Sequence, residues 1–82
     1  MEITVKFFAL MREKAGTETV SLHVPQGASV SQALEILQRQ YPVLAPYIPR
    51  VRLALRQNFV EAATTLQAGD ELALIPPVSG GF

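Results

Sequence analysis

The chain has 82 residues, of which 49% are hydrophobic and 17% are charged, and this predicts one small globular domain. Seven basic side chains balance seven acidic ones, so no overall charge recruits nucleic acid or an anionic membrane. The absence of cysteine excludes a disulfide framework, a thiol nucleophile and a thiolate metal site. No signal peptide and no run of bilayer-spanning length is found, so we expect a soluble cytoplasmic domain.

The first quarter of the chain alternates apolar and polar residues in two runs, which predicts a β-hairpin. The first run predicts a strand over residues 3–9, with a buried face made of Ile3, Val5, Phe7 and Ala9. Phe8 falls on the opposite face, which Thr4 and Lys6 mark as solvated. A short turn or single helical turn over residues 10–15 is closed by Gly16 at positive φ. The second run covers residues 18–24.

One helix is predicted after this hairpin. Ser29 and Gln32 form a capping-box pattern, and Pro42 ends the helix at about Gln40 or Tyr41. Its apolar face consists of Val30, Ala33, Leu34, Leu37 and Tyr41. Residues 42–50 contain three prolines and predict a loop, packed by Val43, Leu44 and either Tyr47 or Ile48.

The second half of the chain predicts three more strands, over residues 51–56, 59–61 and 71–75. Gln57-Asn58 is the expected turn between the first two, Leu66 the anchor of an irregular stretch, and Gly69-Asp70 the last turn. The order ββαβββ predicts an α+β two-layer fold. Because the last strand is almost wholly apolar, we expect it to lie beside the first at the centre of the sheet. This arrangement is the ubiquitin-like β-grasp, with the domain over residues 1–75.

Residues 76–82 form the predicted C-terminal tail. Pro76 and Pro77 end the last strand and stiffen the chain, because proline fixes φ and lacks an N–H. Gly80 and Gly81 have no Cβ and can enter a channel that is too narrow for other residues. The tail is therefore suited to insertion into another protein, although Phe82 follows the two glycines.

Little in the domain predicts chemistry of its own. His23 is the only histidine and has no acidic neighbour in the sequence, so we interpret it as a surface residue. Asp70-Glu71 is better explained as turn chemistry than as an acid–base pair, and Ser29 as a helix cap. No ligand pattern indicates a metal. A self-contained enzyme is not expected.

Two surface features have alternative interpretations. The even spacing of Arg50, Arg52 and Arg56 predicts a basic stripe, either a solvated edge face or a docking site for an acidic partner. If the first and last strands are neighbours, Phe8, Ala73 and Ile75 share an outer apolar patch. That patch is either a protein interface or the floor beneath a loop.

The sequence closely resembles the small subunits of molybdopterin synthase, which are MoaD/ThiS-type ubiquitin-like sulfur carriers. The resemblance covers essentially the whole chain. It rests on Phe7-Phe8-Ala9 with Arg12-Glu13 and Gly16-Thr17, on Leu53-Ala54-Leu55-Arg56-Gln57, where the family often has Asn before the Gln, and above all on residues 69–81, which read GDELALIPPVSGG.

The resemblance implies a defined chemistry for the tail. An ATP-dependent adenylyltransferase of the ubiquitin-activating type would adenylate Gly81, and sulfur would replace AMP to give a thiocarboxylate. The large synthase subunit, in a two-plus-two heterotetramer, would receive the tail and pass the sulfur to cyclic pyranopterin monophosphate. The chain would bind no cofactor, would use ATP only through its partner, and would not be catalytic alone. The expected partner-binding residues are Phe8, Arg12, Ile75, Pro76, Pro77, Val78, Ser79 and Gly80.

Phe82 departs from the family pattern, because Gly81 in an amide cannot be adenylated. We expect a peptidase to remove Phe82 before activation; the alternative is an inactive or divergent homologue that keeps only the docking surface.

Two other functions stay open. One is the sulfur carrier of thiamin thiazole synthesis, whose chains are usually shorter and lack Pro-Pro-Val before Gly-Gly. The other is a non-conjugated β-grasp binding module.

Overall fold

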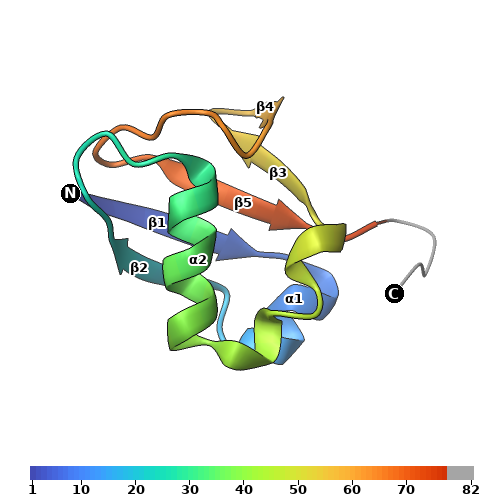
Figure 1. Ribbon diagram of the computed structural model, residues 1–82. Helices are drawn as coiled ribbons and strands as arrows, with labels where there is room; N and C mark the ends of the chain where they lie inside the picture. Colours follow the sequence, from blue (N-terminus) through green and yellow to red (C-terminus); the bar gives the residue numbers. More distant parts are fainter. Residues whose placement is uncertain (78–82) are drawn as a thin grey trace.

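The computed structural model describes residues 1–77, and its centre is a five-stranded sheet with a helix across one face (Figure 1). In chain order the elements are β1 (Glu2–Phe7), α1 (Ala9–Ala15), β2 (Thr19–His23), α2 (Val30–Gln40), the 3₁₀ helices η1 (Pro42–Leu44) and η2 (Ile48–Arg50), β3 (Arg52–Leu55), β4 (Asn58–Val60) and β5 (Glu71–Ile75). Val78 to Phe82 lie outside the described residues.

The strands are arranged in the order β2-β1-β5-β3-β4. β1 runs parallel to β5, and every other neighbouring pair is antiparallel. The last strand therefore lies beside the first in the middle of the sheet, as its apolar sequence predicts. With α2 across one face, the architecture is the predicted ubiquitin-like α+β β-grasp.

The first strand follows its predicted alternation up to Phe7 and then departs from it. Ile3, Val5 and Phe7 are buried under the helix layer. Ala9, expected on the same buried face, is instead exposed and opens α1 with a φ of 47°. The strand ends because this left-handed residue turns the chain sharply. Phe8 is thereby left on the opposite face, where it is 37% exposed.

The predicted start of α2 and the predicted end of the turn before β2 are both confirmed. Ser29 Oγ accepts a hydrogen bond from the Gln32 N–H at 3.2 Å, and Gln32 Oε1 accepts one from the Ser29 N–H at 2.9 Å. This reciprocal pair is the capping box that starts α2. Gly16 closes α1 with a φ of 76°, a conformation that costs glycine nothing.

The segment between α2 and β3 is more regular than a loop, because it forms two short 3₁₀ helices, each with a proline in its first two positions. Leu44 and Ile48 are buried and join the core, as predicted for this stretch. Val43 does not pack inward, since its side chain is 51% exposed. The core prediction was therefore wrong at this residue.

The β3–β4 hairpin turns one residue earlier than predicted. Leu55 pairs with Asn58, so the two turn residues are Arg56 and Gln57, with φ values of 49° and 66°. Two positive φ values characterise a type I′ turn, which usually carries Asn-Gly. Each side chain in this conformation costs roughly 1 kcal/mol or more relative to glycine.

Residues 1–77 show neither a membrane-spanning helix nor a cluster of metal ligands. No helix there is long and apolar enough to cross a membrane. The same residues contain no cluster of three or more His, Asp or Glu side chains that could hold a metal ion.

Candidate functional site

The candidate site lies on the sheet face opposite α2. In β5 the side chains alternate, so that Leu72 and Leu74 are buried while Ala73 and Ile75 are partly exposed on the other side. Ala73 pairs with Ala54 of β3. The parallel register pairs Phe7 with Leu74, which brings Phe8 next to Ile75 at the end of the sheet where β5 finishes.

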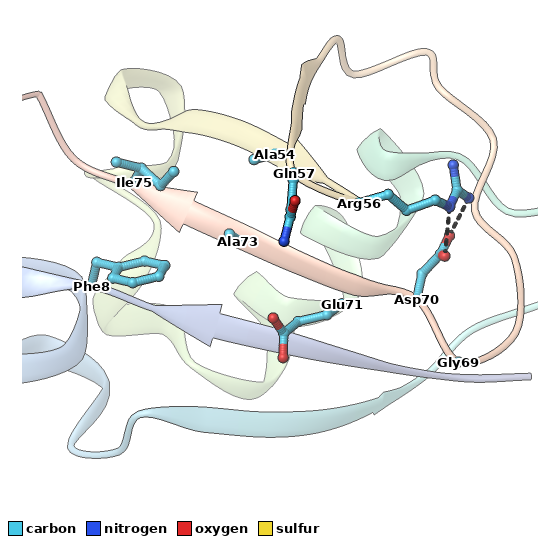
Figure 2. A pocket seen from close by; sticks show the side chains of 9 residues that line it. All are labelled: Phe8, Ala54, Arg56, Gln57, Gly69, Asp70, Glu71, Ala73 and Ile75. Atoms are coloured by element: carbon cyan, nitrogen blue, oxygen red, sulfur yellow. Dashed lines mark hydrogen bonds and ion pairs between the residues drawn. The ribbon is translucent and has the colours of Figure 1, made fainter.

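An open pocket of about 400 Å³ occupies this face (Figure 2). Its apolar end is lined by Phe8, Ala54, Ala73 and Ile75. Its polar end is lined by Arg56, Gln57, Gly69, Asp70 and Glu71. The pocket therefore runs along the whole of β5, with an apolar end near the tail and a polar end near the start of the strand.

A second open pocket of about 400 Å³ lies at the base of the tail. It is lined by Phe8, Ala9, Ile75, Pro76 and Pro77, so Phe8 and Ile75 belong to both pockets. Pro76 is buried and Pro77 is half-buried, which fixes the direction in which the chain leaves the sheet. The surface at the tail base is thus continuous with the pocket along β5.

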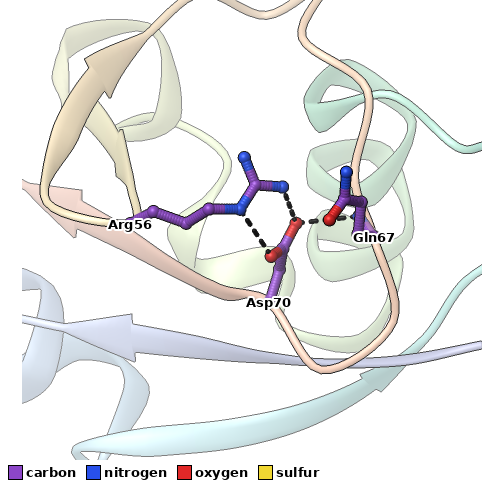
Figure 3. Close-up of polar contacts among 3 residues, drawn as sticks. All are labelled: Arg56, Gln67 and Asp70. Carbon is purple, nitrogen blue, oxygen red and sulfur yellow. Dashed lines mark hydrogen bonds and ion pairs between the residues drawn. The ribbon is translucent and has the colours of Figure 1, made fainter.

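An ion pair shapes the polar end of the first pocket (Figure 3). Arg56 donates from Nε to Asp70 Oδ1 at 3.1 Å and from Nη2 to Oδ2 at 2.7 Å. The backbone N–H of Gln67 donates to the same Oδ2 at 2.8 Å. Asp70 is 8% exposed, and this two-point pairing satisfies its charge. The pair joins the β3–β4 turn to the turn before β5.

A cationic side chain lies over each of two aromatic rings near the pocket. The Lys6 Nζ lies 5.3 Å from the centre of the Phe8 ring, and the Arg52 guanidinium carbon lies 3.8 Å from that of Phe59. Phe59 pairs with Ala54 and is 60% exposed. Aromatic side chains and arginine are enriched at protein interfaces, which fits the contact between Arg52 and Phe59.

The sequence matches the ThiS family over residues 5–81. The chain belongs to the ThiS family. It is 37% identical to the molybdopterin synthase sulfur carrier subunit of Arabidopsis thaliana, over 99% of this chain and 84% of that one. It is 35% identical to the protein of the same name from Homo sapiens, over 98% of this chain and 94% of that one. The crystal structure of SAMP1 from Haloferax volcanii superposes with a TM-score of 0.91 at 32% identity, over 99% and 100% of the two chains.

Four of the residues that the sequence analysis expected to bind a partner lie together. Phe8, Ile75, Pro76 and Pro77 line the pocket at the tail base. Arg12 is exposed on α1 but lines neither pocket. The other expected partner-binding residues, Val78, Ser79 and Gly80, lie outside the described residues. So do Gly81, the expected thiocarboxylate site, and Phe82.

The predicted arginine stripe was wrong. Arg50 belongs to η2, Arg52 to β3, and Arg56 to the following turn, where it is bound to Asp70. The stripe does not form because the strand is shorter than predicted. The edge interpretation also fails, since β3 lies between β5 and β4.

His23 is a surface residue, as predicted, with a largely exposed side chain. Its Nδ1 nevertheless lies 3.8 Å from Glu2 Oε2, because β1 and β2 pair Glu2 with His23. This acidic neighbour comes from the facing strand and is invisible in the local sequence.

Sequence reasoning missed the residues that complete the pocket, chiefly Ala54, Gln57 and Glu71. Ala54 could have been found from its alternation, once β3 was placed beside β5. Gln57 was recognised only as a turn residue, and Asp70-Glu71 only as turn chemistry. The turn prediction itself holds for Asp70, which accepts the Gln67 N–H.

Proposed function

We propose that this ThiS-family chain is a sulfur carrier of molybdenum cofactor synthesis and that Gly81 carries the sulfur. The observation that supports this most directly is the match, over nearly the whole chain, to relatives named molybdopterin synthase sulfur carrier subunits. The pocket at the tail base and the apolar end of the pocket along β5 support a protein that acts through a docked partner.

The proposed chemistry begins at a free Gly81 carboxylate. A carboxylate is a poor electrophile, so an adenylyltransferase partner joins it to the AMP portion of ATP and releases pyrophosphate. Sulfur at the oxidation level of hydrosulfide (HS⁻) then attacks the acyl carbon, the bond to AMP breaks, and a thiocarboxylate remains. Because this activation consumes ATP, we propose that it takes place in the cytoplasm.

The large synthase subunit is the proposed acceptor of the loaded tail, in a two-plus-two complex. There the sulfur is transferred to cyclic pyranopterin monophosphate, the bond between the Gly81 carbonyl carbon and sulfur is cleaved by water, and the Gly81 carboxylate is regenerated. All acid–base groups belong to the partner. The six residues from Pro76 to Gly81 can extend about 20 Å at 3.3 to 3.6 Å each. The body can therefore stay docked through Phe8 and Ile75 while the tail end reaches a buried active site.

Phe82 has to be removed for this chemistry, since it holds the Gly81 carbonyl in an amide. We propose that a peptidase removes it before activation. The test is intact-protein mass spectrometry of the chain isolated from its native host. The expected species has lost one phenylalanine residue and has one oxygen replaced by sulfur. A species that retains Phe82 and still supports pterin thiolation would contradict the proposal.

A second candidate is favoured by the high structural similarity to SAMP1, a small archaeal modifier protein. The chain would then act as a modifier protein rather than as a sulfur donor. The same spectra distinguish the two functions, because a modifier appears in covalent adducts with other proteins.

Co-purification with the large synthase subunit supports the sulfur carrier of molybdenum cofactor synthesis. A thiazole synthase as the sole stable partner would instead indicate the thiamin pathway.

A further inference from the structure

The β3–β4 turn holds two non-glycine residues in the left-handed region, although its geometry suits Asn-Gly. Strain of this kind is retained where the side chains have a task that the rest of the fold supports. For Arg56 the task is visible, because its guanidinium pairs with the buried Asp70. Gln57 has no such explanation in the packing of the domain.

The amide of Gln57 is directed toward β5 and lines the pocket with Ala73 and Glu71 (Figure 2). Among residues 1–77 its side chain has no hydrogen-bond partner. Glu71 is exposed, and its carboxylate has no ion pair within this part of the chain. A donor, an acceptor and a negative charge therefore stand at the polar end of the pocket, beside the Arg56–Asp70 ion pair.

The shape of the pocket indicates what fits there. It follows β5, a strand of five residues, over about 13 Å at the rise of 3.3 Å per residue. This length suits about five residues of an extended peptide. A glutamine amide offers one acceptor and two donors, which matches the C=O and N–H of a peptide group. Because Arg56 neutralises Asp70, the charge left at this end is that of Glu71.

We propose that Gln57 and Glu71 are specificity-determining residues that bind an extended segment of the large synthase subunit along β5. An apolar side chain of that segment occupies the end near Phe8 and Ile75. The Gln57 amide binds a main-chain peptide group, and Glu71 binds a basic side chain. The Arg56–Asp70 pair is a positioning element that holds the turn over the pocket. This inference rests on the proposed function, which supplies the partner.

Gln57→Gly separates a binding role from a folding role, because glycine relieves the strained φ while removing the amide. We expect the variant to unfold at an equal or higher urea concentration than the unmodified chain. We expect its affinity for the purified large subunit, measured by isothermal titration calorimetry, to fall about tenfold, as for the loss of one or two hydrogen bonds. If Gln57 had only a structural role, Gln57→Gly would not weaken binding while leaving stability unchanged or raised.

Glu71→Gln provides the second measurement, since it keeps the size of the side chain and removes the charge. We expect weaker binding at low salt and a smaller dependence of affinity on ionic strength. Phe8→Ser serves as the reference for the docking face as a whole. If Phe8→Ser weakens binding while Gln57→Gly and Glu71→Gln bind like the unmodified chain, this inference is overturned and the proposed docking face stands. If the unmodified chain does not bind the large subunit, both fail.

Discussion

Arg56 and Asp70 join two turns of the domain, fourteen residues apart in sequence, through two hydrogen bonds of 3.1 and 2.7 Å. The aspartate is 8% exposed, whereas the arginine side chain is 49% exposed. The backbone around Asp70 is anchored as well, since its C=O accepts the N–H of Thr4 at 2.9 Å. The pair therefore fixes the hairpin turn of β3–β4 against the two central strands.

Removing the arginine should destabilise the domain. Arg56→Ala leaves the Asp70 carboxylate with only the Gln67 N–H, and we expect a loss of about 1 to 2 kcal/mol after allowing for the exposed guanidinium. Urea unfolding followed by circular dichroism measures this loss. Arg12→Ala, on the exposed face of α1, is the matched control and should change stability by less than about 0.5 kcal/mol. Equal stabilities of the two variants would contradict the prediction.

The capping box of α2 offers a second test of stability. Ser29→Ala removes the acceptor for the Gln32 N–H and should cost about 1 kcal/mol. Ser31 lies two residues further on with an exposed side chain, so Ser31→Ala is the control and should be neutral or slightly stabilising. Thermal unfolding of both variants checks the prediction. A control that loses as much as Ser29→Ala would show that the cap has no special role.

The outer face should be needed for docking and not for folding. Phe8→Ser removes a half-exposed ring that belongs to both pockets, and we expect affinity for the large synthase subunit to fall at least tenfold, or about 1.4 kcal/mol. Its unfolding midpoint should change little. Val43→Ser is the control, because Val43 is similarly exposed but belongs to neither pocket. Loss of binding in both variants would point to a general defect instead of a docking face.

Shortening the tail by one residue tests the role proposed for Gly81. A variant that stops at Gly81 should be adenylated by the purified activating enzyme and ATP without any peptidase, whereas the chain with Phe82 should not. Release of pyrophosphate measures the reaction. A Gly81→Ala variant with the same end point is the control for the need for a narrow tail. Equal pyrophosphate release with and without Phe82 would refute the proposed trimming step.

The sequence predicts most of the strands and the helix α2 because alternation and capping are local and strong, and it places the last strand beside the first. Ile3, Val5 and Leu72 lie where their patterns place them, and the apolar character of β5 identifies a central strand. The secondary-structure predictions are wrong where the backbone conformation of a residue overrides the hydrophobic alternation. Ala9 continues the alternation of β1 in sequence, yet its positive φ ends the strand.

The pocket itself was only partly predictable. Phe8, Ala73 and Ile75 were expected to share a face, and they do. The polar end requires the turn at Arg56 and the contact of that residue with Asp70, which lies in another turn. A contact between two turns leaves no periodic signal in the sequence, so no local reasoning finds it.

The position of β5 also decides how the domain responds to a pull on its tail. β5 is hydrogen-bonded on both sides, to β1 and to β3, and it continues directly into Pro76. Tension along the tail therefore loads both ladders in shear at the same moment, so that many hydrogen bonds share the force. A tail that continued an edge strand such as β4 would load only one ladder, so fewer hydrogen bonds would share the force. The domain is thus mechanically suited to having its end drawn into a partner and withdrawn intact.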